Sequence, residues 1–191
     1  IFERLTIAFD GIAIVTNKKN SIKKLHLAQL SDIFSGKIKN WKEVGGEDMA
    51  IKVIIRNDKS GTASYMKKHV LQKKDLGELI HIKFKNLAYT KNAIVVKNNR
   101  NMAALIAKNK GAIGYMGMGS AVTEGKKKVK IIKYSRLKVG PYHAPSVETV
   151  EYRKYQLSRP LMLIYKADKN PAVKKLKDYL FSKRGQNRIY T

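Results

Sequence analysis

The chain has 191 residues, of which 40 are lysine or arginine and 14 are aspartate or glutamate, so its formal net charge is +26. A hydrophobic fraction of 43% provides enough apolar side chains for a buried core and argues against wholesale disorder. No apolar run approaches the ~20 residues that cross a bilayer as a helix. The sequence has no cysteine, which excludes disulfides, thiolate metal sites and a cysteine nucleophile.

The first part of the chain predicts two strands and a short helix. The strands cover residues 5–9 and 11–16 and flank the pair Asp10–Gly11. Apolar residues then recur at helical spacing and form one face of a helix that ends at Gly36: Leu27, Leu30, Ile33 and Phe34. Trp41 is the only tryptophan and is expected to anchor packing rather than to stack against a ligand.

The middle of the chain alternates strands with helices. Residues 51–55 form a strand rich in β-branched side chains, and a helix opens directly after it at Ser60-Gly61-Thr62. Two further strands, at residues 93–96 and 112–116, flank a helix over residues 101–108.

The last part of the chain predicts two strands and a well-delimited helix. The strands cover residues 129–132 and 161–165. Asn170 caps the helix and Pro171 occupies its first position, ahead of an apolar stripe: Val173, Leu176, Tyr179 and Leu180. Strands separated by helices of about ten residues predict parallel βαβ units in a three-layer α/β sheet.

The polar loop before the Ser60 helix carries the residue types of an anion site. Ligands bind at the carboxyl ends of strands in open α/β sheets, and the first turn of a helix offers unpaired N–H groups. Gly61 leaves room for an anion near the backbone, Ser60 and Thr62 add hydroxyl donors, and Arg56 can supply a forked guanidinium. Asp58 can hold Arg56 in place.

The same loop also has a purely structural interpretation. Ser60 can be a simple helix N-cap, and Arg56 a surface residue paired with Asp58. The loop lacks the Gly-x-x-x-x-Gly-Lys-Ser/Thr pattern of a Walker P-loop. Residue spacing alone leaves the anion site and the structural interpretation open.

Five segments distributed over almost the whole chain carry a family resemblance: Asp10–Ala13, Leu30–Trp41, Arg56–Thr62, Gly111–Tyr115 and Leu157–Leu161. In their order and approximate spacing they resemble the phosphate-binding proteins of bacterial phosphate ABC transporters. One such segment alone would be weak, whereas five in order are specific.

That family folds as two α/β lobes of the type II periplasmic-binding-protein architecture, which close on phosphate. The resemblance implies that residues 1–10 end the first lobe and cross to the second, that residues 11–154 form the second lobe, and that residues 155–191 cross back and complete the first lobe. We therefore expect a nearly complete three-layer α/β lobe with only the C-terminal part of the other. In that family most of the first lobe, including an acidic acceptor for protonated phosphate, comes before the strand at Leu5, and this chain does not contain it.

The resemblance also implies a role for each residue of the polar loop. Arg56, Ser60, Gly61 and Thr62 would contact phosphate, and Asp58 would position Arg56. The protein would be a non-catalytic receptor in the periplasm or on the outer face of the cell membrane, with a lipid anchor as one mode of attachment left open. It would act as a monomer without cofactor or metal, and would deliver inorganic phosphate to the membrane permease of an ABC transporter.

Other function classes are weighed against this one. The same fold can serve as a phosphate or oxyanion sensor or as an adhesion protein. The high positive charge raises a nucleic-acid-binding module as a third hypothesis, but 32 lysines against 8 arginines run through almost every segment, which favours a general compositional bias. The four histidines lack metal-ligand spacing, and no nucleophile–base pair indicates an enzyme.

Overall fold

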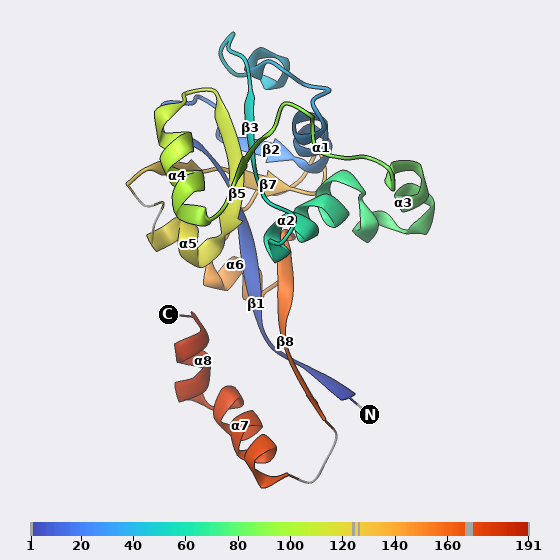
Figure 1. The fold of residues 1–191 in the computed structure, drawn as a ribbon, viewed down its shortest axis with the longest axis vertical. Coiled ribbons are helices and arrows are strands. Elements are labelled where there is room, and N and C mark those ends of the chain that lie inside the picture. The colour runs from blue at the N-terminus through green and yellow to red at the C-terminus, as the bar shows by residue number, and fades with distance from the viewer. Residues whose placement is uncertain (1, 124, 126, 167–169, 191) are drawn as a thin grey trace.

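A single long strand, β1 (Phe2–Asn17), runs through both parts of the molecule (Figure 1). The computed structural model describes residues 2–123, 125, 127–166 and 170–190. The first part of β1 pairs antiparallel with β8 (Ser158–Lys166), and its second part joins a larger sheet. We call residues 12–157 the main body, and residues 2–11 with 158–190 the ribbon unit.

The prediction of two strands divided at Asp10–Gly11 is wrong, because the backbone stays extended through both residues. A Cβ atom at Gly11 would lie 2.9 Å from Val150 Cγ2. The glycine therefore serves the close approach of the helix that carries Val150 to the strand, and does not make a turn.

The sheet of the main body is mixed and has the strand order β4–β3–β5–β1–β6. Parallel pairs, as predicted, join β3 (Lys52–Arg56) to both β4 (Ile94–Val96) and β5 (Ala112–Gly117). Strand β1, however, is antiparallel to β5 and to β6 (Val129–Ile131), so the predicted parallel pairing does not extend to β1. Apolar patterning indicates that β1 is a strand, but it does not fix the direction in which β1 enters from the ribbon unit.

Helices cover both faces of this sheet and give the predicted three layers (Figure 1). Alternate residues of β1 belong to the two cores: Ile12 and Ile14 face one, Ala13 and Val15 the other. All four side chains are fully buried. The helices of the main body are α1 (Leu27–Ser35), α2 (Gly61–Met66) with its π-helical continuation η2 (Lys67–Leu71), α3 (Glu78–Phe84), α4 (Asn99–Lys108), α5 (Met118–Thr123) and α6 (Val147–Glu151).

Several short elements lack the periodicity that sequence patterns detect. They include a two-stranded parallel sheet and two single 3₁₀ turns: β2 (Lys24–His26), β7 (Lys133–Ser135), η1 (Trp41–Val44) and η3 (Lys74–Leu76). Trp41 is fully buried and its indole nitrogen donates to the carbonyl of Gly111 at 3.0 Å, which confirms it as a packing anchor.

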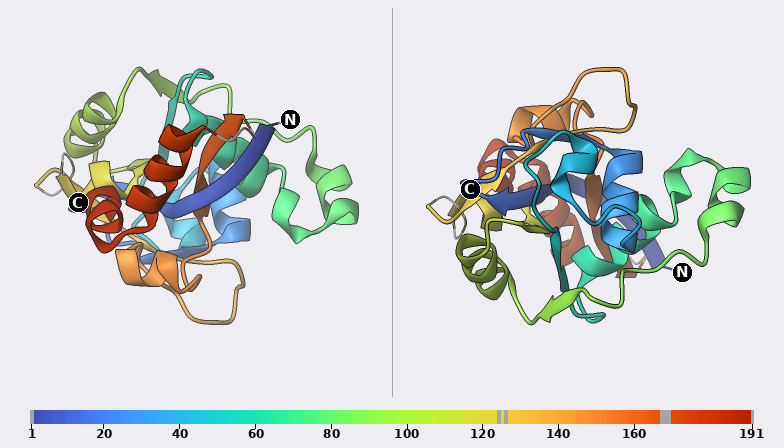
Figure 2. Two further views of the ribbon diagram at one scale, coloured as in Figure 1. Left: turned by 90° about the horizontal axis from the view of Figure 1, so that it is seen from below. Right: turned by 90° about the horizontal axis from the view of Figure 1, so that it is seen from above.

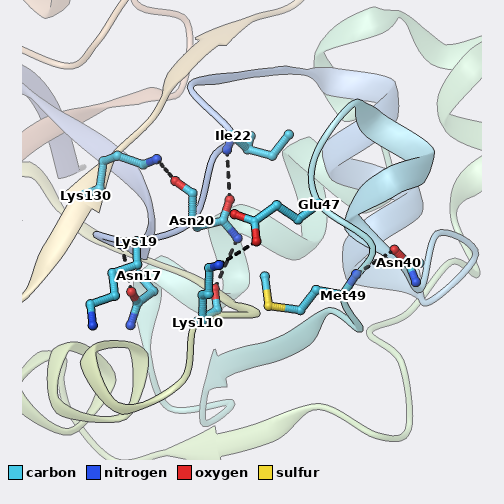
Figure 3. A network of polar contacts seen from close by, with 9 residues as sticks. All are labelled: Asn17, Lys19, Asn20, Ile22, Asn40, Glu47, Met49, Lys110 and Lys130. Carbon is cyan, nitrogen blue, oxygen red and sulfur yellow. Dashed lines mark hydrogen bonds and ion pairs between the residues drawn. The ribbon is translucent and has the colours of Figure 1, made fainter.

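A network of buried amides closes the end of the main body where β1 finishes (Figure 3). The amide of Asn17 donates to the carbonyls of Ile106 and Ala107, each at 2.8 Å, and so satisfies two of the last carbonyls of α4. Asn20 accepts from the amide of Ile22 at 2.9 Å. This network lies beside the amino end of β5, opposite to the carboxyl end of β3, where the polar loop follows.

The ribbon unit consists of the β1–β8 pair and two helices, α7 (Pro171–Phe181) and α8 (Lys183–Tyr190), which lie against one face of the pair (Figure 2). The predicted cap is present, with Asn170 accepting from the amide of Ala172 at 2.9 Å. Gln186 of α8 donates to the carbonyl of Ile7 at 3.0 Å. Side chains of the apolar stripe of α7 stay largely accessible, and none of its described residues is fully buried.

Candidate functional site

The polar loop joins the carboxyl end of β3 to the first turn of α2. Ser60 is the N-cap of α2, and its hydroxyl oxygen accepts from the amide of Ala63 at 3.3 Å. This is the contact that the structural interpretation of Ser60 requires, and the hydroxyl hydrogen is still free to be donated to a ligand. Ser60 and Thr62 are both buried, so the surrounding protein holds the two hydroxyl groups in place.

Arg56 is fixed at both its backbone and its side chain. Its amide donates to the hydroxyl of Tyr115 at 3.2 Å, and its Nη1 donates to Asn99 Oδ1 at 2.6 Å. The amide of Asn99 donates in turn to Ser120 Oγ at 2.7 Å. The buried Nε of Arg56 makes no hydrogen bond to the described residues. The guanidinium is therefore oriented from one side and retains a buried donor.

Asp58 does not pair with Arg56, whose side chain bonds only to Asn99 among the described residues. Asp58 is exposed. Its negative charge adds to the causes that raise the pKa of Tyr89 and of Tyr115, of which burial is the largest in each case. Asp58 and Tyr89 also line one small hollow beside α2.

Two tyrosine hydroxyls connect the loop to the core. The Tyr89 hydroxyl lies 3.3 Å from the Tyr115 hydroxyl and 3.1 Å from the carbonyl of Ala63. Tyr115 is fully buried and also accepts from the amide of Arg56. Strand β5, the end of β3 and helix α2 are held together at this point, which keeps Arg56 in a fixed relation to Ser60.

A second arginine reaches the same helix from the ribbon unit. Arg159 of β8 pairs with Asp10 of β1, with Nη2 3.1 Å and Nε 3.3 Å from Asp10 Oδ2. Its Nη1 lies 3.4 Å from the point where a Cβ atom on Gly61 would stand. The absence of a side chain at Gly61 therefore leaves the first turn of α2 open toward Arg159.

Beyond Arg159 the surface is hollowed over a volume of about 800 Å³. Arg136 and Arg153 also line this hollow, together with His69 and Asp75, whose Nδ1 and Oδ2 atoms are 2.7 Å apart. Arg159 pairs with Asp10, and Arg136 Nη2 lies 3.8 Å from Asp75 Oδ2, so only a small positive excess remains along this flank of α2. Among the described residues no group of three or more histidine, cysteine or carboxylate side chains is placed to hold a metal ion.

Sequence reasoning placed the loop but missed Asn99, Ser120 and Tyr115 as partners of Arg56. The asparagine pair before helix 101–108 was the only signal for Asn99, because α4 begins at Asn99, two residues before the predicted start. In the sequence Arg159 stands out only as part of the segment Leu157–Leu161, and its closeness to Gly61 depends on strand pairing.

The model of the PBP superfamily domain matches residues 3–184 of the chain. The chain belongs to the PBP superfamily. The phosphate-binding protein PstS of Staphylococcus epidermidis is 36% identical over 172 residues, an alignment that covers 88% of this chain and 47% of that protein. The chain therefore spans about half the length of the curated relatives it matches.

Solved structures agree with the family and with the predicted fold. The chain superposes with a TM-score of 0.75 on an ABC-type phosphate transport receptor from Vibrio cholerae, at 30% identity over 97% of this chain and 69% of the receptor. A putative phosphate ABC transporter substrate-binding protein from Clostridium perfringens, with bound phosphate, superposes with a TM-score of 0.72 at 33% identity. This superposition covers 97% of this chain and 68% of that protein. The predicted type II α/β fold, present with only part of the other lobe, is thereby confirmed. No helix among the described residues is long and apolar enough to cross a membrane.

Proposed function

We propose that this chain is the phosphate-holding part of an extracytoplasmic receptor, which captures inorganic phosphate and hands it to the membrane permease of an ABC transporter. The observation that carries the proposal is the meeting of an oriented arginine, two buried hydroxyls and the first turn of α2 at the carboxyl end of β3. The likeness to a phosphate-bound structure at 33% identity supports it.

Each residue of the loop has a distinct role in this proposal. The amides of Gly61 and Thr62 point toward the anion at the positive end of α2, and the Ser60 and Thr62 hydroxyls donate to its oxygens. Arg56, oriented by Asn99, offers its remaining donors. Asp58 is proposed to turn toward Arg56 when the anion is bound.

The strength expected of such contacts is sufficient for a receptor. Hydrogen bonds to charged groups contribute about 1.5–3 kcal/mol each. A handful of them supplies the roughly −8 kcal/mol that corresponds to micromolar affinity, after the cost of ordering the partners. Binding by fixed dipoles needs neither cofactor nor catalysis, and we propose that the protein acts as a monomeric carrier.

The domain organisation follows from the same proposal. Residues 1–10 and 155–191 would belong to the first lobe and the two crossings, and residues 11–154 to the second lobe. Phosphate would lie between the lobes, with the main body as one wall. The receptor would reside in the periplasm or on the outer face of the cell membrane.

The test is a calorimetric titration of this chain with phosphate and, in parallel, with sulfate. We expect heat of binding with phosphate, loss of that heat in Arg56→Ala, and no change in Arg184→Ala, which removes an exposed arginine of α8. Absence of phosphate binding by the unaltered chain, or equal binding by Arg56→Ala, would refute the proposal. A preference for sulfate would assign another oxyanion.

A further inference from the structure

We propose that Arg159 is a second guanidinium of the anion site, which Asp10 holds facing the first turn of α2 so that an arriving anion shares it. The inference rests on the proposed function, because it concerns the same bound anion. It adds a binding residue that the ribbon unit, and not the polar loop, contributes.

The guanidinium of Arg159 presents two different edges. Both of its hydrogen bonds to the described residues use Nε and Nη2, and both go to Asp10 Oδ2. Nη1 instead faces Gly61, 3.4 Å from the point where a Cβ atom would stand. A guanidinium carries five N–H donors in a fixed fork, so the edge turned to α2 still has donors to offer while Asp10 holds the other edge.

The charges around Gly61 favour an anion between them. The first turn of a helix is its positive end, where a cation is unfavourable and an anion is stabilised. Arg159 of β8 nevertheless lies beside this turn, at Gly61, where the loop that carries Arg56 ends. The nearby carboxylates are those of Asp10, already bound by Arg159, and of the exposed Asp58. An oxyanion at the first turn of α2 would compensate both guanidinium groups.

The side chain of Arg159 is partly enclosed. It is 29% exposed and that of Asp10 is 23% exposed, and the two residues stand opposite each other in the β1–β8 pair. Partial burial reduces solvent screening, so a charge here acts more strongly on a neighbouring anion than a fully exposed lysine would. An anion held by both Arg56 and Arg159 would also tie the ribbon unit to the main body.

A purely structural cross-strand pair makes a different prediction. If Arg159 and Asp10 only stabilise the ribbon, removal of either partner breaks the same contact and has the same effect on phosphate binding. If Arg159 binds the anion, Arg159→Gln weakens binding. Asp10→Asn keeps an oxygen that can accept from Arg159 and so hold it in place, but removes the competing negative charge, and therefore strengthens binding. The two variants therefore separate the roles by opposite signs.

The experiment is a ¹H–¹⁵N NMR titration with inorganic phosphate at constant ionic strength, which follows the amide signals of Gly61 and Thr62. We expect Arg159→Gln to raise the Kd about tenfold to a hundredfold, as the loss of a charge-assisted hydrogen bond does. Asp10→Asn should lower the Kd about two- to fivefold. Arg184→Gln, the matched change on α8, should leave it unaltered. The spectrum of each variant also shows whether it is folded.

The outcomes distinguish this inference from the proposed function. Phosphate binding that Arg159→Gln leaves unchanged overturns the role of Arg159 alone, as do equal losses in Arg159→Gln and Asp10→Asn. Absence of binding by the unaltered chain overturns the proposed function and the role of Arg159 with it. If Arg159→Gln does not fold, Arg159→Lys replaces it: this variant keeps the charge but loses the fork, and should still weaken binding measurably.

Discussion

The main body and the ribbon unit are built from similar amphipathic strands and helices, but they bury very different fractions of their apolar side chains. Both hydrophobic cores lie within residues 12–157. In the ribbon unit Ala8 is the only described apolar residue that is buried, while large apolar side chains are open to solvent: Phe2, Met162, Ile164, Leu176, Tyr179 and Phe181.

The same strand shows the cause of this difference. In the main body β1 has β5 and β6 on its two edges and helices over both faces. In the ribbon unit it has β8 alone, and α7 and α8 lie against one face. An alternating or helical pattern thus indicates that a face is apolar, and a second layer is still required to bury it. Elements that pack on two sides should therefore dominate the stability of the chain.

The largest expected effect compares a core side chain with one of the ribbon. Trp41→Ala should lower the free energy of unfolding by about 3–5 kcal/mol, because it removes a fully buried indole and its bond to Gly111. Ile164→Ala, at a side chain that is 57% exposed, should cost less than about 1 kcal/mol. Urea unfolding measures both, and similar losses would show that the ribbon unit is packed as firmly as the main body.

An intermediate effect compares two asparagines at helix ends. Asn17→Ala should cost about 1–3 kcal/mol, because the Ala107 carbonyl loses its buried amide donor, while the Ile106 carbonyl keeps only the backbone amide of Asn109. Asn170→Ala removes the N-cap of α7, worth about 1 kcal/mol. Thermal unfolding should show the larger shift for Asn17→Ala. A larger shift for Asn170→Ala would contradict the ranking of the two regions.

The smallest expected effect is a pH dependence at the boundary between the regions. Burial raises the pKa of Tyr65 to about 12, above its usual 10.0, and its hydroxyl donates to the carbonyl of Ser158 at 2.8 Å. The folded state holds this proton more tightly than the unfolded state does. The contribution of Tyr65 to the free energy of unfolding is therefore complete below pH 10 and is lost as the pH rises toward about 12. Tyr65→Phe should therefore lose less stability than the unaltered chain over this range. Urea unfolding of both proteins below and above pH 10 measures this difference in stability. An equal loss of stability in the two proteins would contradict the prediction.

Local sequence signals were sufficient for much of the fold. The β-branched strand, the Ser60 cap and the Asn170–Pro171 start are short-range features, and the structure has all three. Strand direction and the continuity of β1 were not predictable in the same way. The glycine at position 11 suggests a break in the strand, although it serves the packing of α6, a contact between residues far apart in the chain.

The candidate site likewise contains contacts that the sequence predicts and contacts that it does not. Arg56, Ser60 and Thr62 lie within one loop, so their closeness was predictable from the sequence. Asn99 is 43 residues away from its partner Arg56 in the sequence. Arg159 is held in place by Asp10, which is 149 residues away from it. No periodicity reports such contacts, because they depend on the order of strands in the sheet and on the register of the ribbon.

The continuity of β1 has a consequence for the order of folding. Its second part finds β5 once residues 112–117 have been synthesised, but its first part has no strand partner until residues 158–166 follow. Contacts of such sequence separation form slowly, because a long loop must close before they are made. We expect the main body to fold first during synthesis and the strands of the ribbon unit to pair last. The ion pair of Asp10 and Arg159 would then form only after the main body has folded.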